Sequence, residues 1–173
     1  MPVPILSIVG RSSSGKTTLL ENLIPVLKTR GYKVATIKHN LHDFEIDQPG
    51  KDTWKHQKAG ADTVIISSPL KLAIIEKIEE ELSLQELAKK IQEVDLVLTE
   101  GFKREQEMKI EVIRGNDQPV CTQKEGLWAL VINPESGSGS EVPVSFRNAG
   151  LPIFLWNQLE KLVDAIEQEF LRG

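Results

Sequence analysis

The chain has 173 residues, of which 40% are hydrophobic and 27% charged, with a formal net charge of −4 and a pI of about 5.5. This length suits one compact domain over residues 1–173, and the composition excludes disordered and fibrous classes. The acidic balance argues against a nucleic-acid partner, because proteins that bind nucleic acid usually present a basic face. No apolar run approaches the roughly 20 residues that span a bilayer, and residues 1–10 lack the basic region of a signal peptide, so we expect a cytoplasmic protein without a membrane partner.

Short apolar runs alternate with amphipathic stretches along most of the chain. Strands are expected at residues 4–9, 34–39, 62–67, 70–78, 94–99, 108–114, 127–133 and 152–156. Helices are expected over 16–30, after a capping-box pattern at Ser83, and after Asn157, which is suited to cap the last helix. This alternation predicts an α/β fold of three layers, with a mostly parallel central sheet and helices on both faces.

Two smaller features are interpreted without a functional role. The sequence SGSGS at 136–140 predicts a flexible surface loop. The single cysteine, Cys121, has no partner for a disulfide or a zinc site, so we interpret it as a buried or half-buried thiol without a functional role.

The strongest motif is a phosphate-binding loop between the first strand and the first helix. Residues 10–17 fit the P-loop pattern G-x-x-x-x-G-K-[ST] at every fixed position. The two glycines let successive backbone N–H groups converge on phosphate oxygens, the lysine supplies positive charge, and the threonine hydroxyl is suited to ligate Mg²⁺. The predicted nucleotide-binding residues are Gly10, Arg11, Ser12, Ser13, Ser14, Gly15, Lys16, Thr17 and Thr18.

A P-loop protein needs a carboxylate near the magnesium ion, commonly at the end of a neighbouring buried strand. The strand over 94–99 is flanked by Asp95 and Glu100. Ligands of parallel sheets gather at the carboxyl ends of strands, and five residues place Asp95 roughly 17 Å from that end. We therefore predict Thr17 and Glu100 as the magnesium ligands and interpret Asp95 as the start of the strand.

A polar segment over 38–60 follows the second strand and contains two histidines and several acids. His39, His42 and Asp43 could form a transition-metal cluster, but their spacing completes no zinc site. A solvated loop without a role is a second interpretation. The preferred one is a switch-like segment over the γ-phosphate, in which Asp43 or Asp47 helps to hold magnesium or water.

Taken in order, these motifs resemble the MobB family, the molybdopterin-guanine dinucleotide biosynthesis adaptor proteins. The resemblance covers about residues 5–114 and is most specific in the runs HDFEIDQPGKD and EGFK. By this resemblance the family's nucleotide residues fall on residues 10–18. Its other two motifs fall on His39, His42, Asp43, Asp47, Gly50, Lys51, Asp52, Glu100, Gly101 and Phe102.

The resemblance implies a P-loop fold, binding of GTP with weak hydrolysis, a homodimer, and association with the guanylyltransferase that joins GMP to molybdopterin. It leaves molybdopterin open as a further ligand. The guanine-reading motif N-K-x-D is missing, and only Asn133 lies near the position where base contacts often occur. The preference for GTP is therefore implied by the resemblance alone.

Two alternative functions use the same loop. One is a small-molecule kinase, although the sequence shows no arginine-rich lid of the kind that clamps a transferred phosphoryl group. The other is a metal-handling GTPase, a class that often has histidine near its P-loop. The main expectation is an adaptor that holds GTP on the P-loop, which predicts slow turnover; the catalytic residues are unknown.

Overall fold

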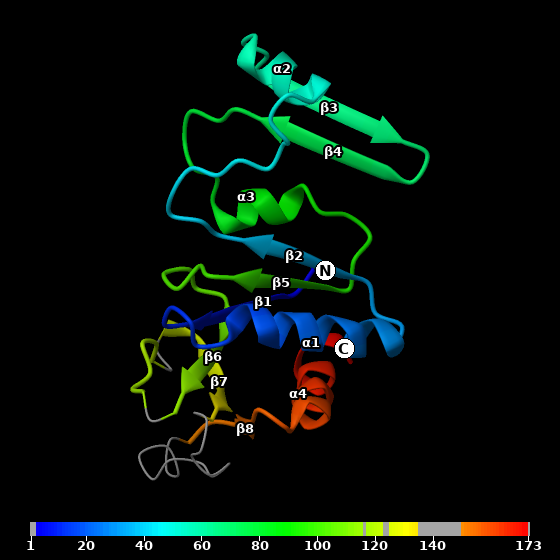
Figure 1. Cartoon of the computed structure of the whole chain (residues 1–173). Coiled ribbons are helices and arrows are strands. Elements are labelled where there is room, and N and C mark those ends of the chain that lie inside the picture. The colour runs from blue at the N-terminus through cyan, green and yellow to red at the C-terminus, as the bar shows by residue number, and fades with distance from the viewer. Residues whose placement is uncertain (1–2, 116, 123–124, 135–149, 173) are drawn as a thin grey trace. The chain divides into compact units, whose positions relative to one another are not determined.

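The computed structural model describes residues 3–115, 117–122, 125–134 and 150–172. The chain divides into two compact units, one made of residues 1–39 and 84–173 and the other of residues 40–83 (Figure 1). The single domain expected over 1–173 stays a prediction, because two such units can belong to one folding domain. The loop expected at 136–140 lies outside the described residues.

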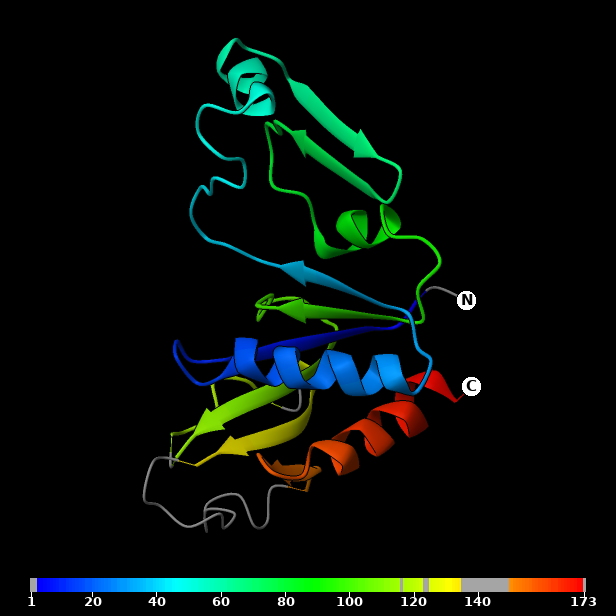
Figure 2. The same ribbon diagram turned by 45° about the vertical axis from the view of Figure 1, so that its right-hand side comes forward.

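The first unit is built on a sheet of six parallel strands (Figures 1 and 2). The strand order is β2-β5-β1-β6-β7-β8. The strands are β1 (Ile5–Gly10), β2 (Val34–Lys38), β5 (Leu96–Glu100), β6 (Met108–Arg114), β7 (Leu127–Asn133) and β8 (Ile153–Leu155). The predicted fold class, an α/β P-loop fold with a mostly parallel sheet, is confirmed.

Helices α1 (Lys16–Thr29) and α4 (Leu159–Ile166) pack on one face of this sheet, and a π-helix, η3 (Glu167–Leu171), follows α4. Every second residue of β1 enters this core, beginning with Leu6 and Ile8. The predicted cap at Asn157 is wrong: α4 begins at Leu159 with Gln158 as its N-cap residue, and Gln158 makes no side-chain capping hydrogen bond. Its amide oxygen instead accepts from the N–H of Leu155 at 3.1 Å, which fixes the turn between β8 and α4.

Arg30 joins the two helices of this face. Its guanidinium contacts Asp164 at 2.7 Å and Glu160 at 2.5 Å, and Glu167 lies 3.3 Å away. These hydrogen bonds, to Asp164 first and then to Glu160, raise the pKa of Arg30. Because Arg30 directly follows α1, this cluster ties the end of α1 to the last helical segment of the chain.

The opposite face of the sheet buries polar side chains. Ser7 and Thr99 share a hydrogen bond of 2.9 Å between β1 and β5. Lys109, on β6, is fully buried, and its ammonium group donates to the carbonyl oxygens of Glu105, Glu107 and Glu125. Because such carbonyls need partners away from water, Lys109 fastens two connecting segments to the sheet.

Glu111 lies two residues further along β6 and is also fully buried. Its carboxylate accepts from the N–H groups of Val120 and Cys121 at 2.6 and 2.9 Å. Burial raises the pKa of Glu111, while these two N–H groups act in the opposite direction. On this face, Cys121 packs with apolar residues of β1, β6 and β7, as expected for a buried thiol.

The remaining helix of the first unit is α3 (Leu84–Lys89), which begins directly after Ser83, as the sequence pattern predicts. Its first residue, Leu84, is fully buried. The Gln85 amide donates to Glu107 at 2.8 Å, so α3 is linked to the connection before β6.

The second unit consists of α2 (Asp52–Lys58) and an antiparallel hairpin of β3 (Thr63–Ser68) and β4 (Lys71–Glu76). Paired residues of a hairpin share a face, so Ile65 lies beside Ile74 and Ser67 beside Leu72. Ile65, Leu72 and Ile74 are all more than half exposed.

Among the helices of the described residues, none is long and apolar enough to cross a bilayer.

Gly10 has the most restricted backbone position in the sheet. It ends β1 with a φ of 142°, and a Cβ there would lie 2.5 Å from the carbonyl oxygen of Val112 on the paired strand. Gly10→Ala should therefore combine a strained conformation, costing about 1–3 kcal/mol, with a backbone clash. Urea unfolding measures the loss.

Gly31→Ala is the matched control. Gly31 also has a positive φ, 94°, but a Cβ there would meet nothing within 4 Å. We expect Gly10→Ala to lose at least about 1 kcal/mol more free energy of unfolding than Gly31→Ala. Equal losses would contradict the close packing of Gly10 against β6.

Candidate functional site

The carboxyl ends of β1, β5 and β2 lie together at one edge of the sheet (Figure 2). Glu100, the last residue of β5, is in register with Ile8 of β1 on one side and with Lys38 of β2 on the other. Because β1 runs on into residues 11–15 and then α1, the predicted P-loop begins at this same edge. The candidate site therefore lies in the first unit, at the edge where three neighbouring parallel strands end.

The P-loop turns through left-handed backbone conformations before α1. Gly15 is the N-cap residue of α1, with a φ of 107°. Ser13 also has a positive φ, 60°, although it carries a side chain. These turns bring the loop to the N-terminus of a 14-residue helix, where free N–H groups and the helix dipole favour an anion.

Lys16 is the first residue of α1, and its side chain extends back over the loop. Its ammonium group donates to the carbonyl oxygens of Arg11 at 2.7 Å and Gly10 at 3.4 Å. Burial lowers the pKa of Lys16; Glu100 acts in the opposite direction, and the positive charges of Lys103 and Lys38 lower it further. Positive charge is thus concentrated around the loop.

Thr17 and Glu100 are brought together from positions 83 residues apart. The Thr17 hydroxyl lies 3.0 Å and 3.1 Å from the two carboxylate oxygens of Glu100. Asp95 is at the other end of β5, where its carboxylate accepts from the backbone N–H of Lys33 at 2.7 Å. The geometry therefore joins Glu100, and not Asp95, to the P-loop, while its role toward magnesium stays a prediction.

Asn133 and Trp156 support the loop from the ends of β7 and β8. The side-chain amide of Asn133 donates to the carbonyl oxygen of Ser14 at 2.8 Å. A Cβ on Gly15 would lie 2.6 Å from that amide nitrogen and 3.0 Å from the ring of Trp156. From the sequence, Asn133 is expected near the position of base contacts; in the structure its side chain bonds to the P-loop backbone. No sequence pattern indicates that Trp156 lies beside the P-loop.

The residues after β2 and β5 also contact each other. The His39 ring stacks on the Phe102 ring, with centroids 4.8 Å apart, and the His39 N–H donates to the Glu100 carbonyl at 3.0 Å. Phe102 is buried and has a φ of 54°, which is unusual for an aromatic residue. A Cβ on Gly101 would lie 3.0 Å from that of His39. The backbone around Glu100 is therefore closely constrained.

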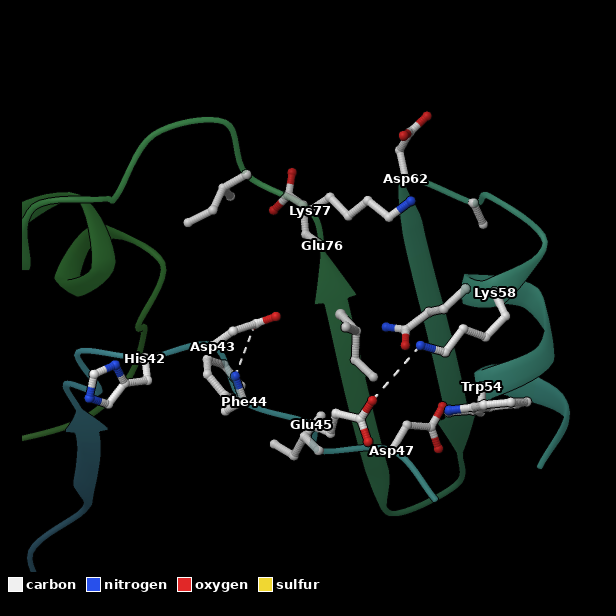
Figure 3. A pocket seen from close by; sticks show the side chains of 15 residues that line it. His42, Asp43, Phe44, Glu45, Asp47, Trp54, Lys58, Asp62, Glu76 and Lys77 are labelled. Atoms are coloured by element: carbon white, nitrogen blue, oxygen red, sulfur yellow. Dashed lines mark hydrogen bonds and ion pairs between the residues drawn. The ribbon is translucent and has the colours of Figure 1, made fainter. Parts of the chain in front are cut away.

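The other residues of the 38–60 segment belong to the second unit. His42, Asp43 and Asp47 line a cavity of about 620 Å³, together with Trp54 and Lys58 of α2 (Figure 3). Lys58 is 3.8 Å from Glu45, and its ammonium group lies 5.5 Å from the centre of the Trp54 ring.

Two polar atoms in this cavity wall, Asp47 Oδ2 and Trp54 Nε1, are buried without a hydrogen-bond partner. Gly50, Lys51 and Asp52 form the start of α2, with Lys51 as its N-cap residue. The switch-like role of this segment stays a prediction.

The loop residues fit a magnesium nucleotide. Neither Gly10 nor Gly15 has space for a side chain, because a Cβ would meet the Val112 carbonyl at Gly10 and the Asn133 and Trp156 side chains at Gly15. A hydroxyl and a carboxylate 3 Å apart are oxygen groups of the kind that Mg²⁺ binds together with water. The ammonium group of Lys16 lies over the loop that would receive the phosphates.

Comparison with known proteins gives a consistent result. The family model for molybdopterin guanine dinucleotide synthesis protein B, MobB, matches residues 5–133. A molybdopterin-guanine dinucleotide biosynthesis adapter protein of Escherichia coli is 44% identical over 116 residues, which cover 65% of this chain and 66% of that protein. The corresponding protein of Haemophilus influenzae is 45% identical over 105 residues, covering 60% and 59%. The matched part is thus less than two thirds of the length of either relative.

Solved structures match over more of the chain. A crystal structure of molybdopterin-guanine biosynthesis protein B has a TM-score of 0.73 at 31% identity and covers 95% of this chain and 98% of its own. The Bacillus subtilis MobB structure has a TM-score of 0.72 at 25% identity, with 98% and 99% covered. On the match of the family model to most of its length, this chain belongs to the MobB family.

Proposed function

We propose that this protein binds GTP with Mg²⁺ at its P-loop and acts as an adapter in molybdopterin guanine dinucleotide biosynthesis. In this role it assists the guanylyltransferase that attaches GMP to molybdopterin, in the cytoplasm and with slow GTP hydrolysis. The observation that supports nucleotide binding most directly is the pairing of Thr17 with Glu100 beside Lys16. The adapter role rests on the names of the relatives, and the preference for guanine rests on the resemblance to the family.

Each group of the site has a defined part in binding. Free backbone N–H groups of the P-loop and of the first turn of α1 would bind the phosphates, and Lys16 would neutralise part of their charge. Thr17 and Glu100 would hold the metal, which would offset the negative charge of the phosphates.

Calorimetric titration with GTP, GDP, ATP and ADP, each with and without magnesium, tests the nucleotide proposal. We expect magnesium-dependent preference for GTP, and we expect Lys16→Ala to weaken GTP binding by about tenfold or more. Thermal unfolding should show that this variant stays folded, because the Lys16 ammonium group contacts only loop carbonyls. Unchanged GTP affinity would refute the P-loop assignment, and a preference for ATP would favour a kinase.

The adapter proposal has its own experiment. The purified protein, with and without GTP and magnesium, is tested for capture of the molybdenum cofactor guanylyltransferase. Capture that Lys16→Ala weakens would support nucleotide-dependent assistance. Failure of capture under all conditions would remove the partner while leaving the nucleotide site intact.

Glu100→Gln tests the metal ligand. We expect it to raise the magnesium concentration needed for half-maximal GTP binding, because an amide is a weaker ligand for Mg²⁺ than a carboxylate. Asp95→Asn is the matched control, since Asp95 lies at the opposite end of β5 and accepts from Lys33. A larger shift for Asp95→Asn than for Glu100→Gln would show that the assignment by strand polarity is wrong.

We further propose a homodimer, supported by the apolar face of the β3–β4 hairpin. Exposed apolar patches of this kind commonly mark protein interfaces. Ile74→Lys should convert the dimer to a monomer in light scattering, because the charge would be buried at the interface. Leu41→Lys is the control, since Leu41 is 82% exposed but lies outside the hairpin. A wild-type monomer, or an Ile74→Lys dimer, would contradict this interface.

A further inference from the structure

Lys38 stands beside the candidate magnesium ligand on the side opposite to the P-loop. It is the last residue of β2 and is in register with Glu100. Its ammonium nitrogen lies 3.8 Å from a carboxylate oxygen of Glu100, and 67% of its side chain is exposed. Because β5 lies between β1 and β2, Glu100 has Thr17 on one side and Lys38 on the other.

The ion pair between Lys38 and Glu100 is weak enough to be exchanged. The two atoms are 3.8 Å apart, and the lysine side chain is 67% exposed on a long flexible stem, although that of Glu100 is only 15% exposed. The Glu100 carboxylate has a second partner besides Lys38, because the Thr17 hydroxyl contacts both of its oxygens. A divalent cation held by Thr17 and Glu100 would compensate the carboxylate, which leaves the Lys38 charge available for an anion.

Positive charge gathers near Glu100 at this edge of the sheet. Lys38 and Lys103 both act on the ammonium group of Lys16, whose charged form they disfavour. The proposed Mg²⁺ would be held beside Thr17 and Glu100 and would offset the charge of the outer phosphates. Lys38 lies beside Glu100 on the strand away from the P-loop, so its charge is suited to the outermost phosphate.

We propose that Lys38 binds the terminal phosphate of a nucleoside triphosphate and makes this site prefer triphosphates to diphosphates. This inference rests on the proposed nucleotide binding and adds a residue that determines which phosphate state is bound. Lys38 is the first residue of the 38–60 segment, in which the sequence pattern assigns magnesium or water to Asp43 or Asp47 and gives the lysine no role of its own. In this role the lysine acts as a point charge, so arginine can replace it in part.

The test compares the affinities of GTP and GDP, both with magnesium, in three variants. Lys38→Gln removes the charge, Lys38→Arg keeps it, and Lys33→Gln removes a charge from the exposed amino-terminal side of the same strand. We expect Lys38→Gln to weaken GTP binding by about tenfold while GDP binding changes little, since GDP lacks the third phosphate. Lys38→Arg should keep most of the preference for GTP, and Lys33→Gln should keep all of it.

Three outcomes would overturn this inference. One is an unchanged ratio of the two affinities in Lys38→Gln, and another is an equal loss for both nucleotides, which would indicate a general field effect. A third is a shift only in the magnesium dependence, equal for GTP and GDP, which would make Lys38 a neutralising partner of Glu100. If the wild-type protein binds neither nucleotide, the proposed function fails first, and the two failures are therefore distinguishable.

Discussion

The parallel pairing of β5 between β1 and β2 is the constraint on which the candidate site depends. Parallel strands bring their carboxyl ends to one edge, so residues from three distant parts of the chain meet in a single row. Ile8, Glu100 and Lys38 are neighbours in that row. A shift of β5 by one residue would turn Glu100 to the other face of the sheet and separate it from Thr17. The site is thus specified by strand register as much as by the P-loop sequence.

Features with a local or periodic cause could be predicted from the sequence. The alternation of strands and helices predicts the parallel sheet, because most apolar runs have the length of a strand and helical stretches separate them. Two runs, over 62–67 and 70–78, form the exposed antiparallel hairpin instead. The choice of Glu100 over Asp95 needs only the direction of one strand and the rise per residue. Its contact with Thr17 follows once the two strands are known to be adjacent.

Features that depend on contacts between distant segments of the chain could not be predicted. A lysine within an apolar strand gives no sign that it is fully buried, yet Lys109 is, because carbonyls from two separate connections converge on it. Ser13 and Phe102 have left-handed backbone conformations although neither is a glycine, so the sequence gives no sign of these conformations. Asn157 is a good capping residue by type, but the turn after β8 places Gln158 at the start of α4.

The contact of Trp156 with the P-loop has a practical consequence. The ring of Trp156 lies next to Gly15 of the P-loop, and indole emission depends on the immediate surroundings of the ring. Trp128, by contrast, packs edge to face against Phe170 in the core, and Trp54 belongs to the second unit. The intrinsic fluorescence of Trp156 should therefore report on the P-loop, and binding of the proposed nucleotide can be followed without an attached dye.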